Sequence, residues 1–217
     1  MIRFALAALA AMLFAGTASA HPHVWVTVSG SVEIDAQGAV KAVHYRWTFD
    51  EAYSAFAIQG LDTDADGKLT REELQPLAEV NAQSLNEYGY FTNPVRGDVS
   101  LLNAFNDPVD FWLDWNGQQL TLNFTLPAGD PFEVRSAPIA IEVFDPTYFV
   151  SFDFAEGDAM PLAPGAPAGC SARLERAGTP DRGLAARLAA IGADEDVPPQ
   201  LLQQVNGYAN AVIVKCD

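Results

Sequence analysis

Basic residues are scarce in this sequence: 12 Lys and Arg stand against 28 Asp and Glu, a formal net charge of −16 at pH 7. So acidic a surface repels phosphate backbones and anionic lipid headgroups, which argues against nucleic-acid binding and favours cations or a basic partner. The chain also lacks a GxSxG motif, a phosphate-binding loop and an HExxH motif. No pair of its many carboxylates stands out as general acid and base, so we expect a protein that is not an enzyme.

Long hydrophobic runs are missing after the N-terminus. The run from Phe4 to Phe14 follows the basic Arg3 and precedes the small-residue sequence Ala18-Ser19-Ala20. It is too short to span a bilayer, which takes roughly 20 residues. The pattern is typical of a secretory signal peptide over residues 1–20. We therefore expect a periplasmic protein without a membrane span, which begins at His21 and carries 11 basic and 28 acidic residues, a net charge of −17.

Cysteine is rare, and both cysteines, Cys170 and Cys216, lie in the mature chain. An even pair in an oxidising compartment is most simply one disulfide. The bond would join the segment GCSARLER to the C-terminal strand NAVIVKCD. Because no CxxC spacing occurs, a metal or redox pair is the weaker interpretation.

Strand signals dominate the apolar pattern. Val24, Val26 and Val28 alternate with polar residues, and a turn over residues 36–38 leads into a second such segment, which predicts a β-hairpin. The sequence DFWLDWNGQQLTLNFTL predicts another hairpin, because its Asn-Gly pair tolerates the positive φ of a tight turn. Apolar residues on both sides of Asp145-Pro146 predict two more strands with a bend or bulge between them.

Helix signals fall in two regions. Residues 51–60 and 71–88 flank an acidic loop, with Thr48 and Glu51 at capping-box spacing, and RGLAARLAAIG predicts a later helix. The Pro- and Gly-rich residues 159–169 predict a loop. Together these patterns predict an α+β fold of mainly antiparallel, sandwich-like β structure. We expect one domain over residues 21–217, with an EF-hand-like helix-loop-helix inserted at 48–88.

The acidic loop DTDADGKLTREE fits a calcium-binding EF-hand at each ligand position. Such a loop needs oxygen ligands at positions 1, 3, 5, 7, 9 and 12 and Gly at position 6. Gly67 falls at position 6, and the predicted ligands are Asp62, Asp64, Asp66, the Lys68 carbonyl, Thr70 and Glu73. EF-hands usually come in pairs, and no second loop of this kind occurs here. A lone loop in an exported protein favours a weak site that braces the structure over a calcium sensor.

The histidines are few and lie early in the mature chain. His21 would offer its terminal amine and its ring, with a second imidazole at His23. Pro22 between them has no amide N–H, so a chelate through that amide is excluded. Amine and imidazole nitrogens suit Cu(II), Ni(II) or Zn(II). His44 is expected level with residues in the early thirties on the neighbouring strand, so its part in this candidate site stays open.

Three segments together resemble the exported family called domain of unknown function 1007: HPHVWV, RWTFDEAYS and VFDPTYFVSF. The resemblance spans most of the mature chain. It implies a periplasmic component of an uncharacterised transport system, often associated with nickel, cobalt or zinc transport genes, and no established activity. The positions that match the family pattern are His21, Pro22, His23, Trp47, Phe49, Asp50, Asp145, Pro146 and Tyr148.

Our leading hypothesis is a periplasmic accessory protein that holds a transition metal (Ni, Co, Zn or Cu) for an inner-membrane metal transporter, with calcium bracing one loop. A second hypothesis is a copper-dependent oxidase, in which the amine of His21 and two imidazoles form a brace around copper. A third is a calcium-braced adaptor for a membrane permease. The oxidase requires a third nitrogen, from His44 or His23, to converge with those of His21.

Overall fold

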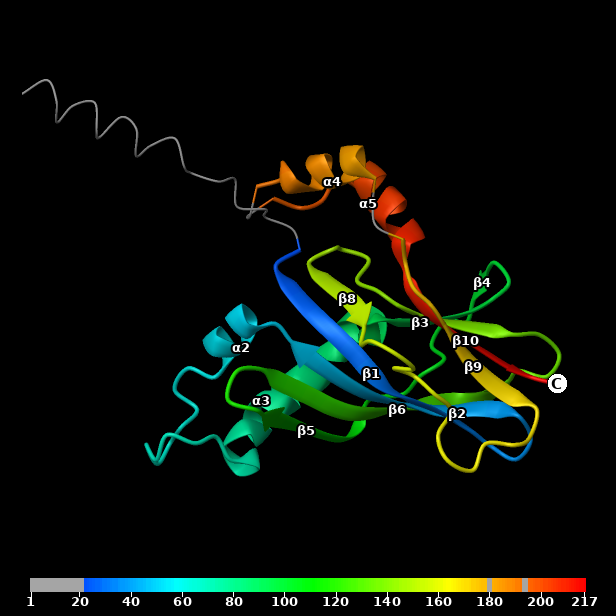
Figure 1. Cartoon of the computed structure of the whole chain (residues 1–217), viewed down its shortest axis with the longest axis horizontal. Coiled ribbons are helices and arrows are strands. Elements are labelled where there is room, and N and C mark those ends of the chain that lie inside the picture. The colour runs from blue at the N-terminus through cyan, green and yellow to red at the C-terminus, as the bar shows by residue number, and fades with distance from the viewer. Residues whose placement is uncertain (1–21, 179–180, 193–194) are drawn as a thin grey trace, which may run out of the picture.

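Two five-stranded β-sheets form the body of the protein. The computed structural model describes residues 22–178, 181–192 and 195–217, so the predicted signal peptide and His21 lie outside the described residues. Figure 1 shows the strands crossing the molecule, with one pair of helices near one end and another along an edge. The predicted α+β fold with mostly antiparallel sheets is confirmed.

Sheet A contains the predicted hairpins. Its strands, in spatial order, are β5 (Val109–Trp115), β6 (Leu120–Glu133), β2 (Ala39–Phe49), β1 (Val24–Ile34) and β8 (Val150–Phe154). The pairs are antiparallel except β1 with β8, which is parallel. The alternation in the first strand holds, since Val24, Val26 and Val28 are buried while Trp25 and Thr27 are exposed.

Sheet B is antiparallel throughout. Its strands, in spatial order, are β4 (Val99–Ser100), β3 (Thr92–Arg96), β7 (Ile139–Val143), β10 (Asn210–Cys216) and β9 (Cys170–Glu175). The strands on either side of Asp145-Pro146 therefore belong to different sheets: β7 ends in sheet B and β8 begins in sheet A. The chain therefore passes from one sheet to the other at Asp145-Pro146, whereas the sequence predicted only a bend or bulge between the two strands.

One hydrophobic core joins the two sheets. It contains Trp47 and Leu122 of sheet A together with Ile141 and Val212 of sheet B, all at most 2% exposed. Burial of such side chains is the main favourable term in folding. Two mostly antiparallel sheets that share one core agree with the predicted α+β fold.

Helices α2 (Glu51–Ala57) and α3 (Arg71–Ser84) flank the acidic loop. Asp50 is the N-cap of α2, because its side chain accepts from the Tyr53 amide; the predicted capping box of Thr48 with Glu51 is wrong. Helix α3 packs against β5 and is followed by a kinked 3₁₀ segment, η2 (Leu85–Phe91), so the predicted helix to residue 88 ends early.

A smaller cluster lies beside the sheets. Helix α4 (Arg182–Ala189) is the helix expected from RGLAARLAAIG, whereas α5 (Pro199–Val205) and the short η3 (Asn206–Tyr208) were not predicted. Leu184, Leu188 and Val205 pack together there. Within the described residues, no helix has the length and apolar character needed to cross a bilayer.

Candidate functional site

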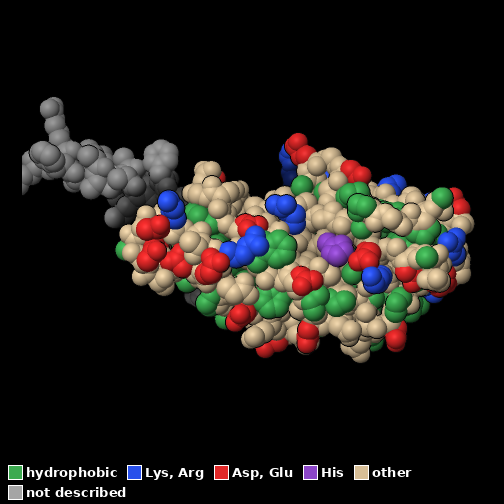
Figure 2. Space-filling view, turned by 90° about the horizontal axis from the view of Figure 1, so that it is seen from below, with side chains coloured by type: hydrophobic (Ala, Val, Ile, Leu, Met, Phe, Trp, Pro, Cys, Tyr) green, Lys and Arg blue, Asp and Glu red, His purple; other side chains and the backbone are tan. Residues whose placement is uncertain are grey.

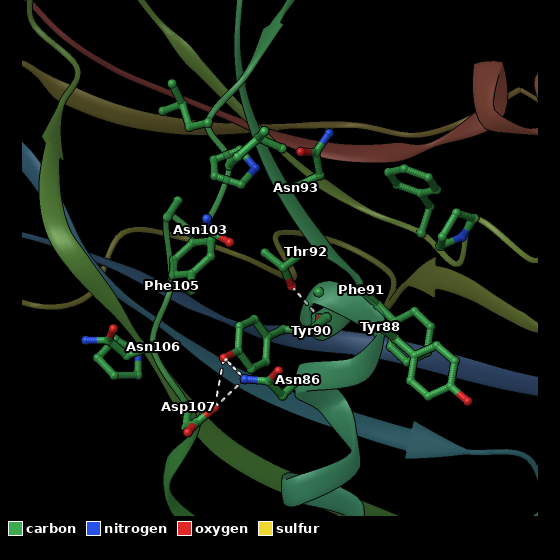
Figure 3. A pocket seen from close by; sticks show the side chains of 18 of the residues that line it. Asn86, Tyr88, Tyr90, Phe91, Thr92, Asn93, Asn103, Phe105, Asn106 and Asp107 are labelled. Carbon is green, nitrogen blue, oxygen red and sulfur yellow. Dashed lines mark hydrogen bonds between the residues drawn. The ribbon is translucent and has the colours of Figure 1, made fainter.

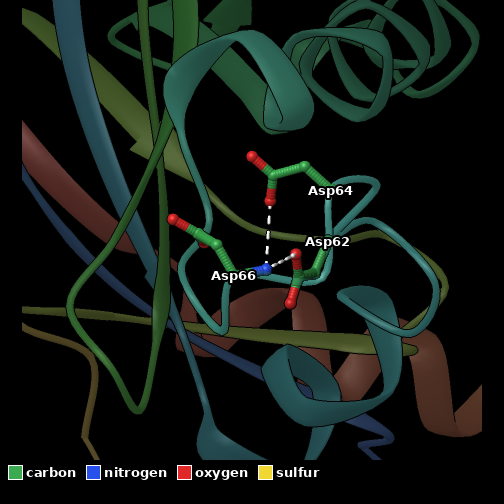
Figure 4. A group of neighbouring side chains, drawn as sticks. All are labelled: Asp62, Asp64 and Asp66. Atoms are coloured by element: carbon green, nitrogen blue, oxygen red, sulfur yellow. Dashed lines mark hydrogen bonds between the residues drawn. The ribbon is translucent and has the colours of Figure 1, made fainter.

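The acidic loop projects from the body of the protein between α2 and α3 (Figure 1). The carboxylates of Asp62, Asp64 and Asp66 converge there, with one oxygen from each within 4.8 Å of the others (Figure 4). Three oxygen donors at this spacing are the ligand type that hard cations such as calcium prefer. The structure thus brings together the first three predicted ligands.

The loop backbone holds these carboxylates in place. The Asp66 amide donates to an oxygen of Asp62 at 3.2 Å and to one of Asp64 at 3.1 Å (Figure 4). The Gly67 amide donates to the other oxygen of Asp62 at 3.0 Å, and the Lys68 amide donates to Asp66 at 2.8 Å. Gly67 has φ of +78°, the left-handed conformation that position 6 of a calcium loop requires.

Glu73, the predicted twelfth-position ligand, is held at the start of α3. Its carboxylate accepts from the amide and hydroxyl of both Thr63 and Thr70, at 2.8–3.0 Å. Thr70 is the N-cap of α3, and Thr70 and Glu73 together form a capping box. Hydrogen bonds from Thr70 and then Thr63 lower the pKa of Glu73 to about 2. Glu73 is therefore ionised and sits at the loop's exit, apart from the three aspartates.

Acidic side chains gather at this end of the molecule. The three aspartates are half-buried or exposed, and the neighbouring Glu72 is also exposed. In Figure 2, red side chains crowd the end where Figure 1 places the α2–α3 loop. Like charges in one short loop repel each other, and a bound cation would relieve that repulsion.

The described histidines lie far apart. His23 precedes β1; its amide donates to the Phe149 carbonyl at 2.8 Å, and its ring stacks on the Phe149 ring with centroids 4.6 Å apart. His44 lies opposite Ser31, level with the early thirties as expected. Ser31 lies eight residues after His23 along the chain. At ~3.3 Å per strand residue, His44 therefore lies about 26 Å further along the sheet than His23. His44 therefore does not share a site with His23.

His44 has partners of its own. Its Nδ1 lies 3.0 Å from the Thr125 hydroxyl, and its Nε2 lies 3.2 Å from a Glu33 carboxylate oxygen. Glu33 also accepts from Lys41 Nζ at 2.7 Å, and this hydrogen bond, with burial opposing it, lowers the pKa of Glu33. These contacts place His44 in a surface network of sheet A.

The predicted disulfide is confirmed. Cys170 and Cys216 are bonded and lie directly opposite each other where β9 pairs with β10. The bond fixes the last strand of the chain to the edge of sheet B.

Segments far apart in the sequence converge at one end of sheet A. The Trp25 amide donates to Asp50 Oδ2, and the Asp50 amide donates to the Trp25 carbonyl, both at 2.9 Å. Next to them, β1 pairs with β8, whose entry is fixed by the buried Asp145. That carboxylate accepts from the amides of Thr147, Phe149 and Val150 and from the Thr147 hydroxyl, at 2.7–3.0 Å. An Asp-Pro-Thr sequence signals such a side-chain turn.

A cavity of about 440 Å³ opens among these segments. Residues of helix α3 and of η2 line part of it. Its aromatic lining is Trp47, Phe49, Tyr53, Phe91, Phe149 and Phe152, together with the exposed Tyr88. We call it the sheet-end cavity. Its lining includes Trp47, Phe49 and Asp145, which the sequence singles out only as family motif positions.

A larger cavity of about 830 Å³ lies where η2 meets β3 (Figure 3). The Tyr90 hydroxyl and the Asn86 amide both donate to Asp107 Oδ1, at 2.9 and 2.8 Å. Tyr90, Phe91 and Asn103 have φ of +57°, +47° and +55°, a conformation uncommon outside glycine. This cavity was not predicted, because its residues come from segments of the sequence without a shared motif.

Comparison with known proteins places the chain in a family. Residues 6–216 match the family described as "Protein of unknown function (DUF1007)". The chain belongs to the DUF1007 family. An uncharacterized protein of Haemophilus influenzae is 23% identical to it over 141 residues, 65% of this chain and 66% of the relative's length. No solved structure matches. The DUF1007 description assigns no activity.

Proposed function

We propose that this DUF1007 protein is a periplasmic metal-binding accessory protein of a transition-metal transport system, with a calcium ion bracing the loop over residues 62–73. The observation that carries the calcium part is the convergence of the three aspartates within 4.8 Å. The Lys68 carbonyl, Thr70 and Glu73 would supply the remaining ligands. Glu73 would exchange its hydrogen bonds with Thr63 for the ion while the N-cap of α3 remains formed by Thr70.

Calcium is the best match because each side-chain donor in the loop is an oxygen. Soft ligands are lacking here, and carboxylates with a backbone carbonyl are the hard set that calcium prefers. The loop lies outside the main core, so calcium would order the connection between α2 and α3, whereas α3 itself places Leu74 and Ala78 in that core. A single loop in an exported protein suits an affinity on the order of 10⁻⁴–10⁻³ M, which keeps the site filled where calcium is abundant.

Isothermal titration calorimetry tests the calcium site. We expect one calcium per chain, and loss of that binding in the double variant Asp62→Ala, Glu73→Ala. The matched control is Glu72→Ala, which removes an exposed carboxylate from the same helical turn and should leave binding within about twofold. Unchanged stoichiometry in the double variant would refute the assignment.

The transition-metal part rests on His21 and His23. His23 lies at the start of β1, beside the cluster of family motif positions, and a carboxylate-poor donor set of amine and imidazole suits Ni(II), Cu(II) or Zn(II). We expect one such metal to bind when residue 21 is the true N-terminus. The control carries an extra Met before His21; equal affinity in that form would rule out a chelate through the terminal amine.

The position of His44 does not favour a copper oxidase. A brace needs nitrogens within about 2 Å of one metal, and His44 lies level with Ser31, well away from His23. His23 is then the remaining source of a third nitrogen, and we propose that the amine of His21 and the two imidazoles hold the metal in a binding role. An inner-membrane transporter is the partner expected for such an accessory, and its docking is tested by co-purification of the two proteins from membranes.

A further inference from the structure

The larger cavity, where η2 meets β3, presents one carboxylate and no basic side chain. Among the described residues that line it there is no Lys, Arg or His, and Asp107 is the one carboxylate. An anionic ligand would meet this charge without a compensating cation. A cationic ligand would gain a partner of opposite charge, so the lining selects for positive charge.

Asp107 keeps one oxygen free for such a ligand. Its Oδ1 accepts hydrogen bonds from the Tyr90 hydroxyl at 2.9 Å and from the Asn86 amide at 2.8 Å, which hold the carboxylate in place (Figure 3). Its Oδ2 accepts none from the part of the chain that the structure describes, and the residue is exposed. Asp145 of the sheet-end cavity differs, because both of its oxygens accept backbone hydrogen bonds. A fixed, accessible carboxylate oxygen suits a charged donor.

A second hollow meets the larger cavity at this carboxylate. Asp107 and Asn86 also line a smaller cavity of about 380 Å³, together with Glu87 and Phe111. The described lining of this smaller cavity again includes no Lys, Arg or His, and it adds the carboxylate of Glu87. Asp107 therefore lies at the junction of two hollows, and the electrostatic potential is negative on both sides of it.

The walls of the larger cavity suit an apolar body. The rings of Phe91, Phe105 and Phe144 and the side chain of Leu101 line it, and Figure 3 shows Phe105 and Phe91 on different sides of the view. The Phe105 ring is held edge-on against Phe132, with centroids 5.7 Å apart. Aromatic rings also attract cations to their faces. The volume of about 830 Å³ falls in the range of small-molecule sites.

Backbone strain concentrates around this cavity. Of the six described non-glycine residues with positive φ, three line it: Tyr90, Phe91 and Asn103. Such conformations cost on the order of 1–3 kcal/mol each and cluster at ligand sites. The turn through Tyr90 and Phe91 brings the Tyr90 hydroxyl to Asp107 and the Phe91 ring to the cavity wall. The strained backbone thus positions both the anchor and the wall.

We propose that the larger cavity binds a small organic cation, a primary ammonium on an apolar body, whose N–H donates to Asp107 Oδ2. The aromatic and aliphatic walls bind the body, and Asp107 selects the charge. The site shares no residue with the calcium loop or with the histidines, so it does not depend on the proposed metal sites.

Three probes with one phenylbutyl body separate the possible ligand classes: 4-phenylbutylammonium, 4-phenylbutanol and 4-phenylbutyrate. Equilibrium dialysis against the full mature protein measures each affinity at an ionic strength of about 0.15 M, which screens attraction to the overall negative charge. We expect one ammonium ion per chain, bound about tenfold more tightly than the alcohol, the ratio that corresponds to one charge-assisted hydrogen bond. The butyrate should bind most weakly.

Asp107→Asn removes the charge of the anchor and keeps one acceptor oxygen for Tyr90 and Asn86. It should weaken binding of the ammonium probe about tenfold and leave the alcohol within about twofold. The matched control is Asp98→Asn, which removes the same charge from an exposed turn outside the cavity. It should leave all three affinities within about twofold, because distant exposed charges are screened.

Val109→Lys tests the same site while Asp107 and its two hydrogen bonds stay in place. Val109 lines the cavity, is 45% exposed and lies two residues after Asp107. A Lys there supplies a competing cation, so it should weaken the ammonium probe at least about tenfold and strengthen binding of the butyrate. Val99→Lys adds the same charge at an exposed position outside the cavity and should change neither affinity by more than about twofold.

Four results would overturn the proposal. They are no binding of the ammonium probe, equal binding of the ammonium and the alcohol to the unaltered protein, the same affinity in Asp107→Asn as in Asp98→Asn, and the same affinity in Val109→Lys as in Val99→Lys. Uptake of many ammonium ions per chain without saturation would show attraction to the acidic surface as a whole and would equally refute the assignment.

Discussion

Tyr90 combines a strained backbone with a specific polar contact. Its φ of +57° is unfavourable for a bulky residue, yet its hydroxyl donates to Asp107 at 2.9 Å inside the larger cavity (Figure 3). The neighbouring Thr92 hydroxyl donates to the Tyr90 carbonyl, also at 2.9 Å. Local strain of this kind persists only where surrounding contacts hold it, and here the Asn86, Tyr90 and Asp107 side chains form those contacts.

Asp107 should make folding sensitive to acid. Hydrogen bonds from Asn86 and then Tyr90 lower its pKa in the folded state, below the ordinary value of about 3.9. Its stabilising contribution is therefore present above about pH 4 and is lost as the pH falls through the lowered pKa. We expect Asp107→Asn to destabilise the protein at pH 7 and to differ less from the unaltered protein at pH 2.5, measured by urea unfolding.

Asp98→Asn is the control for the change in net charge, since Asp98 is exposed in the turn between β3 and β4. An equal effect of Asp107→Asn at both pH values would contradict the assigned role.

Tyr90 should make stability depend on pH on the alkaline side. Burial of its side chain, and then the hydrogen bond to Asp107, raise the pKa of Tyr90. Its contribution is thus complete below about pH 10 and is lost above it, and Tyr90→Phe should remove that alkaline loss.

Single residues were predictable where the signal is local. The EF-hand spacing found Asp62, Asp64 and Asp66 because one tight turn brings them together. Glu73 is a capping residue of α3, which its position in the calcium pattern obscured. The spacing of Thr48 and Glu51 suggested a cap, but the Thr48 hydroxyl lies 3.0 Å from that of Thr121 in the next strand, and the neighbouring Asp50 caps α2 instead.

Hairpins and helices were predictable for the same reason, whereas sheet membership was not. The Asn-Gly turn between β5 and β6 specifies that the two strands it connects pair with each other. Strand β8 pairs with β1, which lies far from it in the sequence, and no short-range signal specifies that pairing. Short elements such as β4 and α5 carry too few periodic residues to be recognised.

Asp50 links helix α2 to the end of strand β1. Asp50→Ala removes the N-cap bond to Tyr53 and the bond to the Trp25 amide, and should lower the free energy of unfolding by about 1–2 kcal/mol. Asp50→Asn keeps one acceptor oxygen and should cost less. Guanidinium unfolding followed by circular dichroism measures both. Equal stabilities of Asp50→Ala and the unaltered protein would show that the cap is unimportant.

The disulfide holds β9 against β10 across a sequence separation of 46 residues. Chain-entropy arguments give a contribution of about 4 kcal/mol for a loop of this length. We expect the double variant Cys170→Ala, Cys216→Ala to lose that amount in chemical unfolding. Reductant should destabilise the unaltered protein similarly and leave the variant unchanged; sensitivity of the variant to reductant would point to another cause.

At the scale of the whole molecule, the acidic loop stands apart from the two-sheet core. Calcium should therefore stabilise the helix pair and, through α3 on β5, the fold. With a dissociation constant of 10⁻⁴–10⁻³ M, 10 mM calcium would add about 1.4–2.7 kcal/mol if unfolding of the loop accompanies global unfolding. Thermal unfolding should show a higher Tm with calcium and no such rise in Asp64→Ala, with Asp98→Ala as control. A rise in Asp64→Ala equal to that of the unaltered protein would contradict a role for the loop.

The parallel pairing of β1 with β8 bears on the order in which the chain can fold. Val24 lies opposite Val150, 126 residues later (150 − 24). A chain that emerges from its N-terminus forms the β1–β2 hairpin early but must leave one side of β1 unpaired until β8 arrives. Unpaired strand edges are sites of aggregation, and distant contacts slow folding. Among the strands of sheet A, β8 is the last to emerge. The outer edge of β1 is therefore the edge of that sheet that stays open longest, and a chaperone that acts before folding is complete would be needed most there.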